Sequence, residues 1–246
     1  MPGFFKPATV LQGACLAMAL AFAPASQAAL TLSTTRVVFD GERRSASLIV
    51  SNPSNRPFAV QTWVNTAADD AVTPVPFMPS PALFRLDPGK EQQVQINGLP
   101  HDLPGDHESL FYFNVQEIPQ ASGDQGNLLN IALRTRIKLF YRPAGLRDNP
   151  VKRLPELRWS VEQQAGKTLL VAHNPTPFHV SFSRLEVSQG QQNERVKNPR
   201  MLAPLHSQSY PLGTLRPAAG LKVTWSAIND YGGQTSPLSQ DVHVSP

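Results

Sequence analysis

Apolar and polar residues alternate in short stretches of this chain, and turn-forming residues separate the stretches. Residues 45–51 place three apolar side chains on one face and mostly serines on the other, which is the period-two pattern of a half-buried strand. Residues 58–65 alternate in the same way. No long stretch shows the 3.6-residue apolar period of an amphipathic helix. The pattern predicts an all-β chain.

Strand-like stretches continue through the first half of the chain. Residues 109–118 are apolar at both parities, so both faces of that strand should be covered. Residues 128–141 run for fourteen residues without proline or glycine, which is long for a strand. Including these, we predict strands at 30–40, 45–51, 58–65, 81–86, 91–96, 109–118 and 128–141. This is the number of strands in one immunoglobulin-type sandwich.

The composition changes after residue 141. Residues 142–156 hold four prolines or glycines and six charged residues, the composition of a linker. A second set of short strands is predicted beyond it, at 157–161, 168–172, 179–187, 201–202, 208–212, 221–228 and 238–244. The sequence therefore predicts two immunoglobulin-like sandwich domains, at 29–145 and 146–246.

Residues 1–28 have the composition of a secretory signal. They contain one basic residue, Lys6, an apolar stretch at 10–23, and small residues just before the expected cleavage after Ala28. The apolar stretch is too short to cross a bilayer, which takes about 20 residues. We expect an exported protein that begins at Ala29; a buried N-terminal helix is the alternative.

Cysteine usage, charge and motifs narrow the chemistry. The single cysteine, Cys15, lies in the predicted signal, which excludes disulfides from the exported part. The formal net charge is +4, and Lys and Arg are scattered rather than clustered with aromatics, so no nucleic-acid partner is expected. The six histidines lack metal-ligand spacing, and no nucleophile-elbow or phosphate-loop motif occurs. Asp69 and Asp70 lie in a turn-like stretch, which favours a solvated turn over an acid–base pair.

Six segments, in order along the chain, resemble the periplasmic pilus chaperones of the chaperone–usher pathway. They are TRVVFDG at 35–41, FRL at 84–86 with PG at 88–89, ESLFYFN at 108–114 with EIP at 117–119, IAL at 131–133 with IKLFYRP at 137–143, NPTP at 174–177 and NDYGG at 229–233. Each segment alone is a weak signal, whereas six in the right order across nearly the whole exported chain are a strong one. The resemblance implies a boomerang of two sandwiches in the periplasm.

The resemblance also implies how such a protein works. Clients of the family are fibre subunits whose own sandwich lacks its last strand, and the chaperone supplies a strand from its seventh. In this sequence Leu129, Ile131 and Leu133 present an apolar row at period two. An exposed apolar edge is an aggregation liability unless a partner with an empty groove is the intended ligand. The alternative is that these three residues belong to an ordinary central strand.

Two further sets of residues follow from the resemblance. Arg36 and Lys138 look like the family's two basic cleft residues, which hold the client's C-terminal carboxylate; the alternative is two surface cations. Lys138 has the opposite parity to the apolar row, and twist or a bulge would reconcile this. Glu108, Arg142 and Asp230 look like the family's interdomain charge cluster, against an alternative of three unrelated surface charges.

The leading interpretation is therefore a non-enzymatic chaperone with no catalytic residue, metal or cofactor, and no small-molecule substrate. It would bind and cap pilus subunits, deliver them to an outer-membrane usher, and self-associate through its donor edge when free. The short connection at 119–127 and the absence of cysteine from the exported chain fit the short-loop branch of the family.

Two other classes of protein compete with this interpretation. A fibre or adhesin subunit usually has a single incomplete domain and a cysteine pair. An exported β-sandwich hydrolase or carbohydrate-binding module needs an exposed aromatic platform or convergent carboxylates. Trp63, Trp159 and Trp225 are instead expected in the cores.

Overall fold

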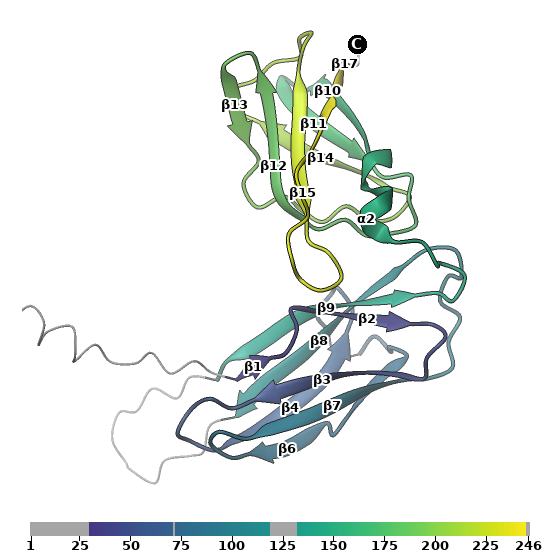
Figure 1. Cartoon of the computed structure of the whole chain (residues 1–246), viewed down its shortest axis with the longest axis vertical. Helices are drawn as coiled ribbons and strands as arrows, with labels where there is room; N and C mark the ends of the chain where they lie inside the picture. Colours follow the sequence, from purple (N-terminus) through teal and green to yellow (C-terminus); the bar gives the residue numbers. More distant parts are fainter. Residues whose placement is uncertain (1–29, 71, 119–131, 245–246) are drawn as a thin grey trace, which may run out of the picture.

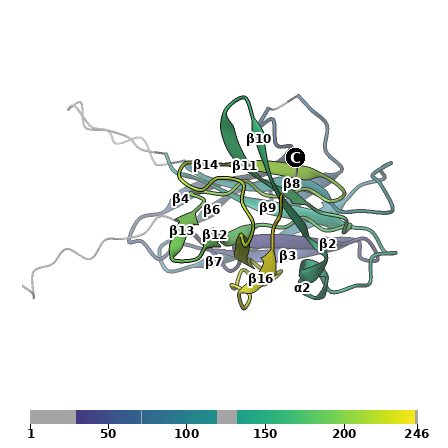
Figure 2. The same cartoon turned by 90° about the horizontal axis from the view of Figure 1, so that it is seen from above.

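The computed structural model describes residues 30–70, 72–118 and 132–244, and it contains two β-sandwiches (Figure 1). Each sandwich is made of two packed sheets, which confirms the predicted all-β, two-domain fold. The two bodies follow one another along the long axis of the molecule, so they overlap when viewed from above (Figure 2). None of the described helices is long and apolar enough to cross a membrane.

The first domain packs a sheet of order β1-β3-β7-β5 against one of order β2-β9-β8-β4-β6. Its strands are β1 (Thr31–Leu32), β2 (Arg36–Asp40), β3 (Ser45–Ser51), β4 (Phe58–Asn65), β5 (Phe77–Ser80), β6 (Leu83–Leu86), β7 (Glu91–Gly98), β8 (Ser109–Ile118) and β9 (Arg134–Arg142). Between the sheets Phe77 lies at the centre of an aromatic cluster, with ring centroids 5.0 Å from those of Phe39 and Phe111. These residues belong to one continuous apolar core.

The bounds of β4 and β8 agree with the alternation in the sequence, whereas the predicted strand at 30–40 is divided. Its first part, β1, pairs with β3 in one sheet, and its second part, β2, pairs with β9 in the other. The chain changes sheets at residues 33–35, where the Thr34 hydroxyl donates to the carbonyl of Arg36. The sequence analysis also missed β5, an edge strand that contains Pro79.

The expectation that Trp63 lies in the core is wrong. Alternate residues of β4, among them Val60 and Val64, enter the core, and the odd parity of Trp63 places it on the outward face of the sheet. Neighbouring β8 follows the same rule: Phe111 and Phe113 are buried, while Tyr112 is only half-buried on the outward face. Both faces of β8 were expected to be covered, and the outward one is covered only in part.

The second domain packs sheets of order β14-β11-β10-β17 and β13-β12-β15-β16. Its strands are β10 (Arg158–Gln164), β11 (Lys167–His173), β12 (Phe182–Gln189), β13 (Gln192–Arg195), β14 (Ser207–Leu212), β15 (Lys222–Ala227), β16 (Leu238–Asp241) and β17 (His243–Val244). Trp159 and Trp225 lie in its core with ring centroids 5.1 Å apart, as predicted. The sequence analysis missed β13, and residues 201–202 contribute a single bridge rather than a strand.

The predicted linker contains local structure. Within it lie a short helix, α2 (Pro150–Arg153), and a 3-10 turn, η1 (Leu154–Glu156). The Asn149 side chain accepts a hydrogen bond from the amide of Val151 at 2.9 Å, and Pro150 occupies the first turn, so this helix start has a favourable cap. Leu154 is buried in the core of the second domain, which ties the connection to that domain.

Candidate functional site

Strand β9 has one edge that is only partly paired. On one side it pairs with β8 from Arg134 to Tyr141. On the other side the parallel strand β2 begins at the pair Arg36 and Lys138 and continues toward the second domain. Within the part of the chain that the structure describes, Arg134–Ile137 of β9 therefore has a partner on one side only. This leaves a short open edge next to the domain junction.

The residues expected to donate a strand lie just before β9. The carbonyl of Leu133 still accepts a hydrogen bond from the amide of Glu117 at 3.0 Å, so the pairing with β8 extends by one residue. The side chain of Leu133 is 50% exposed although it is apolar. Leu129 and Ile131 lie outside the described residues.

Arg36 and Lys138 lie side by side at the point where the open edge ends. Arg36 is 8% exposed and donates from Nη1 to the carbonyl of Ile228 at 2.9 Å, while its buried Nε has no acceptor among the described residues. Lys138 donates from Nζ to the Ser181 hydroxyl at 2.7 Å. Neither cation forms an ion pair with a carboxylate of the described chain. The site therefore holds two adjacent positive charges, neither of them bonded to a carboxylate among the residues that the structure describes.

Burial shifts the pKa of both cations. Burial lowers the pKa of Arg36 from its ordinary value, although the charges of Asp230 and Glu108 oppose the shift. Burial, together with the charge of Arg36, lowers the pKa of Lys138 to about 8. Both shifts show that the charged forms are disfavoured in the free protein. An anion close to the two side chains would favour the charged forms again and would be attracted by both cations.

The parity of Lys138 needs neither the twist nor the bulge considered above. The ladder between β8 and β9 keeps its register from Arg134 to Tyr141. Lys138 faces away from the core, and the second domain lies against that same face, where Phe140 packs 5.4 Å from the His179 ring. Leu133, the one described residue of the apolar row, therefore has the opposite parity to Lys138 beside a regular ladder, and the face that carries Lys138 meets the second domain.

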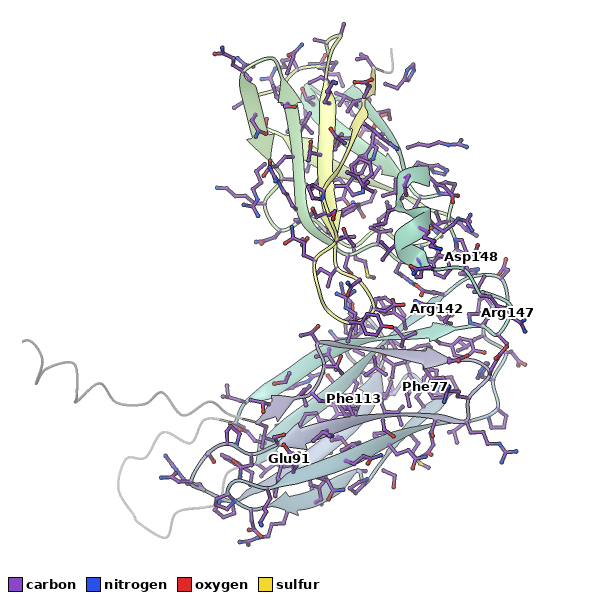
Figure 3. All side chains as sticks on the ribbon, in the orientation of Figure 1. Phe77, Glu91, Phe113, Arg142, Arg147 and Asp148 are labelled. Carbon is purple, nitrogen blue, oxygen red and sulfur yellow. The ribbon has the colours of Figure 1, made fainter. Side chains whose placement is uncertain are left out.

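The structure brings Glu108, Arg142 and Asp230 together at the domain junction, where Figure 3 labels Arg142. The guanidinium donates to Glu108 at 2.7 Å and to Asp230 at 2.8 Å. Glu108 is 3% exposed and also accepts from the His179 backbone amide at 2.8 Å. Burial alone would lower the pKa of Arg142, but hydrogen bonds and charges from Asp230 and Glu108 outweigh it and raise the pKa.

Other residues of the junction have no local signal in the sequence. Ile228, Ser181 and His179 all belong to the second domain, and they meet Arg36, Lys138 and Glu108 of the first. Phe140 and Ile228 also help to line a small cavity between the domains. The described residues contain no group of His, Cys, Asp and Glu that could hold a metal ion.

Comparisons with known proteins agree with this arrangement in both halves. Residues 29–147 match the model of the PapD N-terminal domain, a pili and flagellar-assembly chaperone, and residues 153–238 match the C-terminal domain of the pili assembly chaperone PapD. The chain belongs to this chaperone family. The resemblance found in the sequence is thereby confirmed at the level of the family.

Relatives of this chaperone match over most of their length. Chaperone protein FimB/FhaD of Bordetella pertussis is 37% identical over 228 residues, which cover 89% of this chain and 91% of that protein. The crystal structure of YadV chaperone has a TM-score of 0.76 and 33% identity, and the match covers 87% of this chain and 100% of that one. A structure of the Salmonella enterica SafA pilin in complex with the SafB chaperone has a TM-score of 0.75 at 27% identity, covering 87% and 96%.

Membership in the family defines the class of function. The protein is a periplasmic fimbrial chaperone of the chaperone–usher pathway that binds pilus subunits, and it is not an enzyme. The two competing interpretations, a fibre subunit and an exported hydrolase or binding module, are therefore wrong.

Proposed function

We propose that this chaperone binds its client by strand addition along the open edge of β9 and holds the client's C-terminal carboxylate between Arg36 and Lys138. The observation that carries the proposal is that the open edge of β9 ends at two partly buried cations, which form no ion pair with a carboxylate of the described residues. Unpaired strand edges recruit other strands, and cations in a partly dry site recruit anions. A client strand that ends in a carboxylate satisfies both.

Leu129, Ile131 and Leu133 form the donor segment in this proposal. Burial of an aliphatic side chain in a client's groove contributes about 1.5–3 kcal/mol, and each new edge hydrogen bond contributes about 0.5–1.5 kcal/mol. The half-exposed Leu133 supports this role, because the described residues of its own domain leave this apolar side chain, just before β9, only half covered. Together these contributions offset the cost of association and stabilise a client that lacks a strand.

The direction of the client strand follows from the same geometry. From Lys138 onward the edge of β9 is occupied by β2, so a client strand pairs with the residues before Lys138, among them Arg134–Ile137. If its C-terminal carboxylate lies at Lys138, its preceding residues run back toward Arg134. The client's last strand then runs in the same direction as β9, and the two form a parallel pair.

Glu108, Arg142 and Asp230 set the angle between the domains in this proposal. Arg142 follows Lys138 on the same strand and binds one carboxylate from each domain. The contacts of Arg36 with Ile228 and of Lys138 with Ser181 also cross the junction. A fixed angle therefore keeps both cations in place for the client.

Further parts of the assignment rest on the sequence alone. The short connection at 119–127 and the lack of cysteine after residue 15 support membership in the short-loop branch. We further propose that the chaperone delivers its clients to an outer-membrane usher. We also propose that the free chaperone self-associates through its donor edge, because strand pairing covers an open edge.

Co-expression in a bacterial periplasm with a tagged subunit from a neighbouring gene tests the proposal. Wild-type chaperone should be recovered with the subunit in a one-to-one complex, and Arg36→Ala and Lys138→Ala should lose it while remaining folded. Arg158→Ala, an exposed site in the second domain, serves as the charge-matched control. Equal recovery with all four proteins would show that the two cations do not hold the client.

A further inference from the structure

The second domain also has an open strand edge. Strand β14 is the last strand of its sheet and pairs only with β11, so its other edge has no strand beside it among the described residues. The amide of Asn174 donates to the carbonyl of His206 at 2.9 Å, and backbone groups alternate in direction along an antiparallel strand. Ser207, Ser209 and Pro211 therefore direct their backbone groups to the open edge. Proline has no amide hydrogen, so this edge offers the amides of the two serines and three carbonyls.

A groove lies against this edge. It is lined by residues 209–211 of β14 and by residues 194–200, which end β13 and continue into the loop that follows. The volume of the groove is about 590 Å³, against about 30 Å³ for the cavity between the domains. Of these two spaces, only the groove has room for a segment of another polypeptide.

The loop beside the groove is held in place at three points. The carboxylate of Glu194, the one acid among the residues that line the groove, accepts hydrogen bonds from the turn after β14. Val196 packs in the core, and its amide donates to the carbonyl of Leu185 at 2.9 Å. The carbonyl of Arg200 accepts from the Tyr210 hydroxyl at 2.8 Å. Because the loop is already ordered, a partner that binds there loses little free energy in ordering it.

Three cations of this segment, Arg195, Lys197 and Arg200, are exposed and line the groove. None of the three forms an ion pair with a carboxylate in the described parts of the chain. Arg195 lies opposite Glu186 in the ladder between β12 and β13, but that carboxylate binds Arg184 at 2.6 Å. The groove therefore carries three positive charges against one negative charge.

We infer that the groove binds an acidic, extended segment of a partner protein, which adds as a strand to the open edge of β14. The edge binds the backbone of the segment, and the three cations attract its carboxylates. A second copy of this chain is disfavoured as the partner, because two sets of three cations would repel one another. The chain after residue 145 holds eleven Lys and Arg against seven Asp and Glu, whereas residues 29–145 hold ten against eleven. The charge of the second domain therefore also favours an acidic partner.

Short synthetic peptides test this inference, and each carries a C-terminal amide so that it lacks the carboxylate of the proposed client site. Threonine alternates with glutamate in the first peptide and with lysine in the second. In the third, proline replaces threonine beside the same glutamates, which keeps the charge but prevents strand pairing. Affinity is measured by fluorescence anisotropy at about 50 mM salt, where surface charges are weakly screened. Wild type should bind the first peptide roughly tenfold more tightly than either of the others.

Variants show whether the groove is responsible. The double variant Lys197→Gln/Arg200→Gln should bind the threonine–glutamate peptide roughly five- to tenfold more weakly than wild type. Arg158→Gln/Lys167→Gln removes two exposed charges from the same domain outside the groove, so it should keep the wild-type affinity. Arg36→Ala should also keep it, because the proposed client site lies in the other domain. Thermal unfolding of each variant checks that it is folded.

Four outcomes would each overturn the inference. Equal affinity for the threonine and proline forms of the acidic peptide would show that charge alone, without strand addition, causes binding. Equal losses in the two double variants would assign binding to net charge rather than to the groove. Loss of binding in Arg36→Ala would place the peptide at the client site instead. Binding to phosphatidylglycerol vesicles, with no peptide bound at millimolar concentration, would identify the cations as a contact for a membrane surface.

Discussion

Arg36 and Lys138 are direct partners at the first pair of the parallel ladder between β2 and β9, although they are far apart in the sequence. The ladder brings two positive side chains together at a point where water is partly excluded. Such a pair is unfavourable in the free protein, because burial and mutual repulsion both oppose the charged forms. In the proposed function a carboxylate between the two side chains would offset both effects, so the cost of the arrangement would fall on the free chaperone only.

Client affinity should fall when the pH rises through the pKa of Lys138. That pKa is lowered to about 8, mainly by burial and then by the charge of Arg36. A bound carboxylate favours the protonated lysine, so affinity should be highest below pH 8 and decline above it toward the level that Arg36 alone provides. Titration calorimetry with a carboxylate-terminated peptide from pH 6.5 to 9.5 measures this. Lys138→Arg should bind without the decline, and a flat wild-type profile would contradict the assignment.

Replacement of Lys138 by methionine should stabilise the free chaperone while weakening client binding to the level that Arg36 alone provides. The pKa of Lys138 is lower in the folded than in the unfolded state, so the unfolded chain binds more protons between about pH 8 and 10.5. Wild-type stability should therefore rise with pH in that window, and the buried charge is a liability below it. At pH 7 we expect Lys138→Met to be more stable by about 1–2 kcal/mol, a figure discounted for solvent screening.

Urea unfolding at pH 7 and at pH 10 provides the measurement for this variant. The advantage of Lys138→Met should shrink at pH 10, where wild-type Lys138 is mostly neutral in the folded protein. Lys152→Met, an exposed site in α2, is the matched control and should change stability little. A Lys138→Met protein less stable than wild type at pH 7 would show that the bond to Ser181 outweighs the burial of the charge.

Much of the first domain could be predicted from local pattern, because alternation reports which residues form strands. The bounds of β4 and β8 were predicted to the residue. Alternation does not report which of the two faces meets the core, and a large aromatic is easily assigned to the wrong one. Trp63 faces outward beneath Arg134, and only the parity of Val60 and Val64 in the same strand indicates this.

The site was predictable only in part for a related reason. Arg36, Lys138 and Arg142 were identified because they lie in segments that resemble the family, not because of their charge or spacing. Their partners Ser181 and Ile228 belong to the other domain, and the contacts depend on how the two sandwiches meet. No periodicity within one strand encodes that arrangement.

Removal of Arg142 should destabilise the chaperone far more than removal of the charge of Asp230. Arg142→Ala leaves Glu108, which is 3% exposed, without its ion-pair partner, and an unpaired buried charge costs about 3–5 kcal/mol. Asp230→Asn should cost less than about 1 kcal/mol, since the Asp230 side chain is 34% exposed. Guanidinium chloride unfolding compares the two variants.

The same two variants also test whether the cluster sets the domain angle. Small-angle X-ray scattering should show a broader distribution of interdomain distances in Arg142→Ala than in wild type. Equal losses of stability in Arg142→Ala and Asp230→Asn would mean that Glu108 finds water when Arg142 is removed. An unchanged scattering profile would assign the domain angle to the apolar contacts around Phe140 and His179 instead.

Glu194 should contribute stability to the second domain that is lost in acid. Burial alone would raise its pKa, but hydrogen bonds from the Thr214 hydroxyl at 2.7 Å and from the amides of Gly213, Thr214 and Leu215 lower the pKa to about 2. These bonds attach β13 to the turn after β14, a region without any motif in the sequence. The Glu194 carboxylate therefore holds this turn in place through hydrogen bonds rather than through apolar packing.

The sign of the effect follows from the direction of the shift. A carboxyl group whose pKa is lower in the folded state stabilises the protein fully at a pH above the ordinary pKa of 4.5. This stabilisation disappears as the pH falls toward 2. Glu194→Gln should therefore be less stable than wild type by about 1–2 kcal/mol at pH 6 and equal to it near pH 2. Glu162→Gln, in β10 of the same domain, is the matched control. Urea unfolding across this pH range measures the stability of both variants. If the two variants lose the same stability, the role of Glu194 is contradicted, because the loss then reflects net charge rather than the hydrogen bonds from residues 213–215.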